Sequence, residues 1–299
     1  MTHPYASRAY AQALAGEGSI IHVSELDTWA IPRQVAGTDE WDAQMPYPFS
    51  PIARPCSGVH LRNTLKEQGI VSLVGVTDAL DDGCDWYPAV FDFVRPYKDH
   101  YVIDRDHAPV QVSRHHRYEI RKSERVCETG VVSLQDRIDE WCALYDTLVA
   151  RHRLGRSHKF SRSYFEVLAR MPEFVAIGAT IGGRLVSCHI WVRFDGRAYS
   201  HLSASSEEGY HHAAAYSVMD YAIAHFDGCR LIDLGGVPDN SPSGPGLQRF
   251  KKGFANGTRR NWICGSIVDR DRYDSLSRGI DNGPAATMYF PAYRALGQA

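Results

Sequence analysis

Five basic residues and no acidic residue occupy the window 246–268, which makes it the clearest candidate for chemistry in this 299-residue chain. The whole chain has a formal net charge of −2, so this gathering of cations is local. The window follows a predicted buried strand, and its centre, 247–254, reads Leu-Gln-Arg-Phe-Lys-Lys-Gly-Phe. Fixed cations beside a site that excludes water can hold a phosphorylated donor or stabilise an anionic transition state. We therefore expect an anion-binding loop here, with positive charges at Arg249, Lys251, Lys252, Arg259 and Arg260.

A second basic segment, residues 113–125, is predicted to be a helix. Ser113 is a suitable N-cap, and the segment holds five Arg or Lys residues against two Glu. Arg114, Arg117 and Arg121 follow the spacing i, i+3 and i+7, so one helical face can present all three. Such a face either is solvated or binds phosphate groups, and both interpretations remain open.

Asp233 is the carboxylate most suited to a functional role, because it lies near the end of the apolar strand 229–234. A buried carboxylate must find a partner or titrate at a higher pH. It either orients the acceptor amine or receives its proton, or it makes a structural hydrogen bond to the turn Gly235-Gly236 that follows.

Cysteine and histidine patterns indicate neither a metal site nor a covalent nucleophile. The seven cysteines are scattered without a C-x-x-C pair, and Cys229 and Cys264 lie in apolar strands as expected core residues. The pairs His115-His116 and His211-His212 are adjacent, and adjacent side chains do not converge on a helix. We expect these histidines at the surface, and no metal.

The elements that must position these residues follow a regular order in the second half of the chain. Apolar periodicity predicts helices, and Gly182-Gly183 and Asp195-Gly196 are hairpin signals between strands. The predicted helices cover 134–152, 161–170 and 210–226, and the predicted strands cover 173–181, 184–193, 197–204, 229–234 and 260–269.

This order is that of the acyltransferase fold named for the Gcn5-related N-acetyltransferases (GNAT). We therefore expect an α+β protein with a mixed, mainly antiparallel sheet flanked by helices. In that fold two central strands splay apart, and the notch between them accepts the acyl donor. Here those strands would be 197–204 and 229–234, so the notch would be walled by Ser203 and Ser205 on one side and by Gly235 and Gly236 on the other.

The first part of the chain is less regular, with Pro and Gly punctuation between short apolar runs. Residues 69–76 and 86–94 are predicted strands, and 58–68 is a predicted helix. We interpret 1–112 as a degenerate GNAT-like subdomain in tandem with a catalytic GNAT-like subdomain, 113–275. The tail, 276–299, carries aromatic residues at 287–294 that are expected to dock on the body.

Four motifs together resemble the Fem-type aminoacyltransferases, a family with two GNAT-like domains. They are Tyr199-Ser-His-Leu-Ser-Ala-Ser205, Leu231-Ile-Asp-Leu-Gly-Gly-Val237, Gly246-Leu-Gln-Arg-Phe-Lys-Lys-Gly-Phe254 and the basic helix 113–125. The resemblance covers 113–270 well and the N-terminal part loosely. It implies transfer of an amino acid from a charged tRNA to an amine of a peptidoglycan precursor, a small peptide or a natural product.

The resemblance also implies roles for individual residues. Lys251 would stabilise the tetrahedral oxyanion, and Phe250 would pack near the terminal nucleotide of the donor. The basic residues of both segments would hold the acceptor stem of aminoacyl-tRNA, which serves as co-substrate without a further cofactor. Aminoacyl esters have a good leaving group, so direct displacement is sufficient. Several members of that family carry a long coiled-coil insertion, and this sequence contains no sustained heptad pattern. A smaller acceptor than the lipid-linked cell-wall precursor fits this difference, but shorter members also act on soluble precursors, so the acceptor stays open.

Two other function classes remain open. An acyltransferase that uses acetyl-CoA or another acyl-CoA would place a glycine-rich pyrophosphate loop after the strand 197–204. This chain has Glu207 and Glu208 there, and they would repel a pyrophosphate. A non-catalytic nucleic-acid or interaction module would keep the basic patches without needing Lys251 in the notch.

The hydrophobic content of 44% is ample for a core. The N-terminus lacks the apolar segment of a signal peptide, and no run approaches the roughly 18 apolar residues of a membrane span. We therefore expect a cytoplasmic protein, whose oligomeric state the sequence does not specify.

Overall fold

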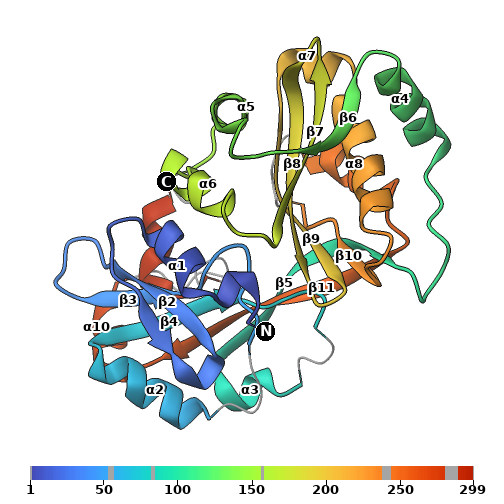
Figure 1. Ribbon diagram of the computed structural model, residues 1–299. Coiled ribbons are helices and arrows are strands. Elements are labelled where there is room, and N and C mark those ends of the chain that lie inside the picture. Colours follow the sequence, from blue (N-terminus) through green and yellow to red (C-terminus); the bar gives the residue numbers. More distant parts are fainter. Residues whose placement is uncertain are drawn as a thin grey trace. The chain divides into compact units, whose positions relative to one another are not determined.

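A computed structural model describes residues 2–52, 57–81, 85–155, 158–237, 244–279 and 289–298. The chain divides into two compact units (Figure 1), one formed by Met1–Tyr97 with Arg260–Ala299 and the other by Lys98–Arg259. It leaves the first unit within strand β5 (Phe93–Asp104) and returns within strand β11 (Gly257–Ile267). Residues 260–299 thus group with the N-terminal part of the chain, whereas the sequence analysis placed the strand 260–269 in the second subdomain.

In the first unit, β2 (Thr28–Gln34) pairs antiparallel with β1 (Ile21–Val23) and with β3 (Trp41–Gln44). Strand β4 (Ile70–Val76) then lies parallel to β3 and antiparallel to β11. The helices of this unit are η1 (Pro4–Ala6), α1 (Arg8–Ala15), η2 (Ser24–Leu26), α2 (Gly58–Glu67), α3 (Tyr87–Val90), α10 (Arg270–Leu276) and η5 (Ala292–Gln298).

The predicted strand 69–76 and helix 58–68 are confirmed as β4 and α2. The prediction of a strand over 86–94 was wrong, because Tyr87–Val90 forms the short helix α3 and β5 starts only at Phe93. Pro88 stands in the first turn of α3, where a missing backbone N–H is tolerated, and Tyr87 and Val90 are buried one helical turn apart. The alternation of apolar residues there reflects a helical face rather than a strand.

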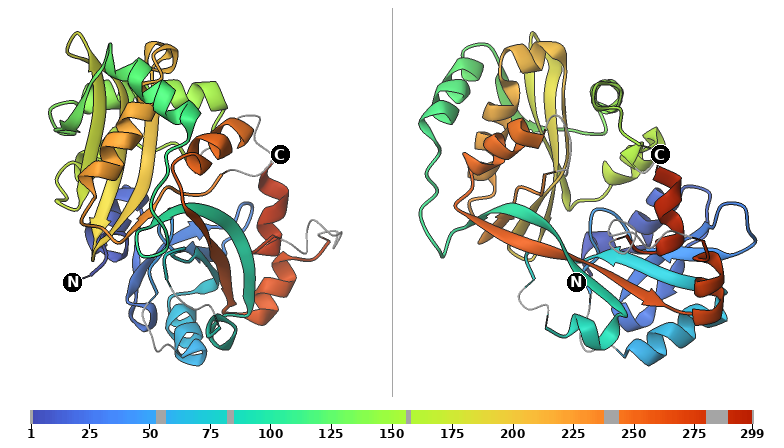
Figure 2. Two further views of the ribbon diagram at one scale, coloured as in Figure 1. Left: turned by 90° about the vertical axis from the view of Figure 1, so that its right-hand side faces the viewer. Right: turned by 180° about the vertical axis from the view of Figure 1, so that it is seen from behind.

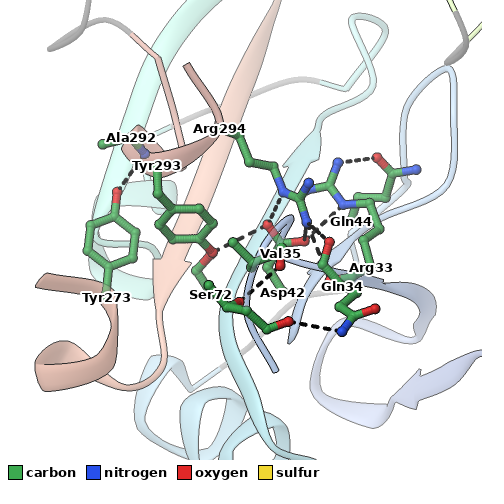
Figure 3. Close-up of polar contacts among 11 residues, drawn as sticks. Arg33, Gln34, Val35, Asp42, Gln44, Ser72, Tyr273, Ala292, Tyr293 and Arg294 are labelled. Carbon is green, nitrogen blue, oxygen red and sulfur yellow. Dashed lines mark hydrogen bonds and ion pairs between the residues drawn. The ribbon is translucent and has the colours of Figure 1, made fainter. Parts of the chain in front are cut away.

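The C-terminal tail docks on the first unit through a buried carboxylate, as Figure 3 shows. Asp42 is fully buried, and the guanidinium groups of Arg33 and Arg294 donate to it at 2.9 and 2.5 Å. The hydroxyl of Tyr293 lies 2.7 Å from that of Ser72 and donates to Asp42 at 3.3 Å. The contacts of Tyr293 and Arg294 agree with the expected docking of the tail, while Thr287 and Met288 lie outside the described residues.

The second unit is built on the strands β5, β10 (Leu231–Asp233), β9 (Arg197–Ser205), β8 (Arg184–Phe194), β7 (Phe174–Ile181) and β6 (Glu128–Val132), in that spatial order. All neighbours described are antiparallel except β9 and β10, which are parallel. Figures 1 and 2 show α4 (Arg114–Glu124) and α8 (Ala214–His225) on one face of this sheet, and α5 (Ile138–His152) and α6 (Arg162–Leu168) on the other. Among the described residues, this unit also contains the helices α7 (Glu207–His211) and α9 (Gly244–Lys252).

Two predicted elements of this unit need correction. The helix predicted over 210–226 is two helices, α7 and α8, separated where Ala213 adopts a left-handed conformation with φ of 57°. The expected anion-binding loop is instead the C-terminal part of α9 followed by the start of β11. Arg259 and Arg260 lie on β11, and Arg249, Lys251 and Lys252 lie in the last turn of α9. Cations are favourable there, because the last carbonyl groups of a helix carry partial negative charge.

The expected splay between two central strands is confirmed. Strand β10 pairs with β9 only opposite Arg197–Tyr199, within the described residues. Strand β9 continues to Ser205 with β8 as its partner, while the chain leaves β10 after Asp233. The two strands therefore separate at Tyr199 and Asp233, and the residues after Asp233 lie where the splay begins.

Candidate active site

The site is built on the turn that follows β10. The carboxylate of Asp233 is buried, and the N–H of Gly235 donates to its Oδ1 at 2.7 Å. Gly235 has a φ of +82°, which a side chain would strain. The N–H of Leu234 donates to the carbonyl oxygen of Tyr101 on β5 at 2.8 Å. The turn is thus held from both ends, and the structural interpretation of Asp233 as a partner of this turn is correct.

Lys251 reaches this turn from the end of α9. Its Nζ donates to the carbonyl oxygen of Gly236 at 2.6 Å. A Cβ atom added to Gly235 would lie 3.0 Å from that Nζ, so the missing side chain at Gly235 makes room for the ammonium. Burial lowers the pKa of Lys251 to about 8, with Lys98 acting in the same direction and Asp233 opposing it. At pH 7 Lys251 is therefore charged and poorly hydrated.

His100 on β5 is a member of the site that the sequence analysis missed. Its Nδ1 lies 2.8 Å from Oδ2 of Asp233, and its side chain is 12% exposed. A Cβ atom on Gly236 would lie 3.0 Å from Cδ2 and 3.2 Å from Nε2 of the imidazole. His100 belongs to no recognisable motif and is 133 residues from Asp233, so only the pairing of β5 with β10 reveals it.

Phe250 belongs to an aromatic cluster that fixes the end of α9. Its ring packs edge-on against Tyr216 of α8 at 4.9 Å between centroids, and against Phe254 at 5.4 Å. The ring of His116 stacks on Phe250 at 6.1 Å, and its Nε2 lies 2.8 Å from the carbonyl oxygen of Phe250. The predicted pair Phe250-Lys251 is therefore held by its backbone as well as by its ring.

His116 joins the basic helix to the Phe-Lys segment. The Nε2–H donates to Phe250, so Nδ1 accepts the hydrogen bond of 2.8 Å from the hydroxyl of Ser113. A Cβ atom on Gly253 would lie 2.1 Å from Cε1 of His116, which explains the glycine in Lys-Lys-Gly-Phe. Burial lowers the pKa of His116. The expectation of a surface residue is wrong for His116, which is buried, and correct for the exposed His115.

The predicted cationic residues fall into two groups. Arg259 is tied to Asp104 by an ion pair of 3.2 Å. Lys251 is desolvated by burial, whereas the other predicted cations on helices α4 and α9 are exposed. The two helices are connected by the contact of His116 with Phe250 and by a hydrogen bond of 3.1 Å from the N–H of Ser113 to the carbonyl oxygen of Gly253. The exposed residues are Arg114, Arg117 and Arg121 on α4, and Arg249 and Lys252 on α9.

The two serines predicted on β9 differ in their surroundings. Ser203 is exposed, whereas Ser205 is buried and lies 2.8 Å, hydroxyl to hydroxyl, from Ser187. The expected role of Ser205 in a donor-binding wall is therefore not supported by its position. Nearby, His189 bonds to Ser200 at 2.8 Å, and burial together with the charge of Lys251 lowers the pKa of His189 to about 3.

The helix after β9 has no glycine-rich start. Ser206 caps α7 by accepting from the N–H of Gly209 at 3.1 Å, and the first turn carries Glu207 and Glu208. Glu208 pairs with Arg184 at 2.5 Å. A Cβ atom on Gly209 would lie 2.2 Å from the carbonyl oxygen of Val186, so this glycine serves close packing rather than phosphate binding.

Among the described residues, no group of three or more His, Cys, Asp or Glu side chains is arranged to hold a metal ion. Cys229 and Cys264 are buried core residues, as expected. No helix in the described ranges has the length and apolar character needed to span a membrane.

The strands β9 and β10, with Lys251 beside the point where their pairing ends, form the arrangement expected for the donor notch of the GNAT fold. Residues 113–252 match the family model described as an acetyltransferase (GNAT) domain, and this range contains α4 to α9. No curated protein sequence matches the chain. The GNAT domain carries every predicted site residue except Arg259.

Solved structures of Fem-like proteins share the fold. FemX is 12% identical with a TM-score of 0.62, over 91% of this chain and 95% of that one. The C-terminal domain of a putative lysylphosphatidylglycerol synthetase from Agrobacterium fabrum is 12% identical with a TM-score of 0.59, over 88% of both chains. The protein L-PGS from Bacillus licheniformis is 13% identical with a TM-score of 0.55, over 91% of this chain and 94% of that one. The expected GNAT fold is thus confirmed, and these solved structures share it.

Proposed function

We propose that this protein is an aminoacyltransferase that moves an amino acid from aminoacyl-tRNA to an amine and forms an amide by direct displacement. The acceptor class is a small peptide, a natural product or a peptidoglycan-type precursor. The observation that carries the proposal is the contact of Lys251 with the turn Gly235-Gly236, which fixes an ammonium group at the point where β9 and β10 separate.

An ammonium group at this point has a role in the chemistry of amide formation. Attack of an amine on an ester places negative charge on the carbonyl oxygen, and a preorganised donor to that oxyanion lowers the barrier. An ammonium has three N–H donors, and Lys251 uses one for Gly236, so it can hold an oxyanion without leaving its anchor. Its lowered pKa of about 8 still leaves it protonated at neutral pH.

Charge distribution favours tRNA as the donor. The N-terminus of α7 carries Glu207 and Glu208 where a CoA-dependent enzyme would bind pyrophosphate, and negative charge there is unfavourable to that ligand. The exposed arginines of α4 and the cations of α9 lie on two helices that His116 connects. Phosphate groups of an acceptor stem fit such a surface, and the binding would weaken as salt is raised.

A second candidate is an acyl-CoA-dependent N-acyltransferase. The match of residues 113–252 to an acetyltransferase (GNAT) domain favours it, as does the splay between β9 and β10. A non-catalytic nucleic-acid module is the third alternative, and it would use the same exposed cations without any turnover.

The donor is tested directly by supplying each candidate. The purified protein is incubated with tRNA charged with radiolabelled amino acids, or with labelled acetyl-CoA, against a panel of primary amines. We expect a labelled amide from aminoacyl-tRNA only, and its formation should stop after RNase treatment. Product that forms from acetyl-CoA and survives RNase would exclude the tRNA donor, and binding of tRNA without any product would support the non-catalytic module.

A further inference from the structure

The geometry points to His100 as the proton acceptor for the incoming amine, with Asp233 holding the imidazole in the required tautomer. This inference rests on the proposed amide-forming reaction and adds a residue that belongs to none of the motifs in the sequence. It concerns the acceptor side of the site, whereas Lys251 acts on the donor carbonyl.

The first observation is the pairing of His100 with Asp233. A carboxylate can only accept hydrogen bonds, so Nδ1 of His100 carries the proton that it donates to Oδ2 at 2.8 Å. The proton on Nδ1 leaves Nε2 as the basic nitrogen. Oδ1 of Asp233 accepts from Gly235, so both carboxylate oxygens are engaged in holding the dyad and the turn.

The second observation is the convergence of these groups with Lys251 on two adjacent residues. A Cβ atom added to Gly235 would lie 3.0 Å from Nζ of Lys251. A Cβ atom added to Gly236 would lie 3.2 Å from Nε2 of His100. The Cα atoms of adjacent residues are about 3.8 Å apart, so the ammonium and the imidazole face neighbouring points of one turn. The charge of Asp233 also opposes the lowering of the Lys251 pKa, so this carboxylate acts on both groups.

The third observation is accessibility. The carboxylate of Asp233 is 4% exposed, whereas the imidazole of His100 is 12% exposed. Of the two groups, the imidazole is the one that an amine can reach. Two lysines lie near the imidazole of His100. One is Lys98, on the same strand β5, and its Cβ would lie 3.3 Å from a Cβ atom added to Gly236. The other is Lys251 on α9, whose pKa the charge of Lys98 lowers. The positive charge of Lys251, which is held by Gly236, disfavours a protonated amine, while the carboxylate of Asp233 favours the proton on His100.

The proposed reaction begins with a proton transfer and ends with the release of the donor's oxygen. An ammonium substrate transfers one proton to Nε2 of His100, and the freed lone pair attacks the carbonyl carbon of the donor ester. The C–N bond forms, and the electron pair of the C=O bond moves to the oxygen, where Lys251 holds it. When the intermediate collapses, the bond to the departing oxygen breaks and that oxygen takes the second N–H proton. His100 then releases its proton to water.

The test compares two acceptors that differ in their need for a base. Methylamine is protonated at pH 7 and must lose a proton before it attacks, whereas hydroxylamine is neutral. Transfer from charged tRNA to each acceptor is measured for the wild type and for His100→Asn, which keeps an N–H group for Asp233. We expect the variant to slow transfer to methylamine roughly 100-fold or more and transfer to hydroxylamine less than about tenfold.

Two further variants complete the set. Asp233→Asn can donate to Nδ1 and so place the proton on Nε2, and it should show the same selective loss with methylamine. His115→Asn changes an exposed histidine and should leave both rates unchanged. Equal loss with both acceptors, or no loss with either, would overturn the role of His100. If only acetyl-CoA serves as donor, the tRNA donor is excluded and the same comparison is made with acetyl-CoA.

A second measurement does not depend on turnover. Nitrogen NMR of histidine-labelled protein, assigned with His100→Asn, should show Nδ1 protonated and Nε2 unprotonated at neutral pH. In Asp233→Asn the proton should move to Nε2. A wild-type His100 with its proton on Nε2 would overturn the proposal, whatever donor the enzyme uses.

Discussion

The ammonium of Lys251 donates a hydrogen bond of 2.6 Å to the carbonyl oxygen of Gly236, and the preceding residue, Gly235, lacks the side chain that would crowd this ammonium. The lysine is thus positioned by backbone rather than by an opposing charge alone. Because a backbone carbonyl neither titrates nor changes rotamer, the anchor stays in place while the reaction charge forms and disappears.

Replacing Lys251 by alanine should lower turnover by about 10²–10³-fold while donor binding persists, because one preorganised oxyanion donor is lost. The matched control is Lys252→Ala, which removes the neighbouring exposed lysine. Its turnover should stay near that of the wild type, and its effect should appear as weaker binding that depends on salt. Steady-state rates and filter binding of charged tRNA measure the two effects, and unchanged turnover of Lys251→Ala would exclude the oxyanion role.

Gly235→Ala should also reduce turnover, since its Cβ would crowd the Nζ of Lys251 at 3.0 Å. The backbone φ of +82° adds strain of about 1–2 kcal/mol for a residue with a side chain. Gly130→Ala is the control, because its Cβ would meet no atom within 4 Å and Gly130 has no positive φ. Thermal unfolding and turnover of both variants are to be compared. Equal activity in the two would mean that the space at Gly235 does not position Lys251.

The stability of the protein should depend on pH through Lys251. Its pKa is about 8 in the folded chain and 10.5 for an ordinary lysine, so between these values the unfolded chain binds more protons. The free energy of unfolding of the wild type relative to Lys251→Met should therefore rise from pH 8 to pH 10.5, by up to about 3 kcal/mol. Below pH 8 the difference in the free energy of unfolding should be constant. The methionine variant should there be most stable relative to the wild type. Urea unfolding at a series of pH values measures this, and a flat difference would mean that the lysine is not desolvated.

His116→Ala should lower turnover without removing any group from the reacting atoms. The change removes the hydrogen bond to the carbonyl oxygen of Phe250 and the ring that packs on it, so the end of α9 loses its support on α4. His115→Ala, on the exposed side of the same turn, should leave turnover unchanged. We expect His116→Ala to reduce kcat more than the affinity for charged tRNA, because the exposed cations remain. A loss of affinity alone would contradict this role.

The docking of the C-terminal tail should depend on Asp42 more than on Arg294. Asp42→Ala leaves two guanidinium groups, Arg33 and Arg294, without their buried partner, and breaking a buried ion pair costs about 3–5 kcal/mol. Arg294→Ala leaves Asp42 with Arg33 and the hydroxyl of Tyr293, so its effect should be smaller. Denaturant unfolding of the two variants gives the comparison, and a larger effect of Arg294→Ala would show that the tail is held by other contacts.

Local patterns in the sequence predicted much of the second unit. Hairpin signals such as Gly182-Gly183 and Asp195-Gly196 depend on the conformation of the turn itself, and their positive φ values are present in the structure. Caps such as Ser113 and Ser161 likewise act within one helical turn. Errors arose where distant packing decided the outcome, as in α3 and in the break at Ala213.

The sequence by itself predicted the GNAT fold and indicated Phe250, Lys251 and Asp233 as candidate site residues, because turn chemistry and the Asp-Leu-Gly-Gly element are local patterns. Only the tertiary structure decided that His116 supports the Phe-Lys segment, that Ser205 is buried against Ser187, and that His100 pairs with Asp233. The physical reason is that each of these contacts joins residues from different strands or helices. The pairing of β5 with β10 brings His100 to Asp233, and the pairing of β8 with β9 brings Ser187 to Ser205. The packing of α4 near the end of α9 brings His116 to Phe250. No local sequence pattern encodes these pairings.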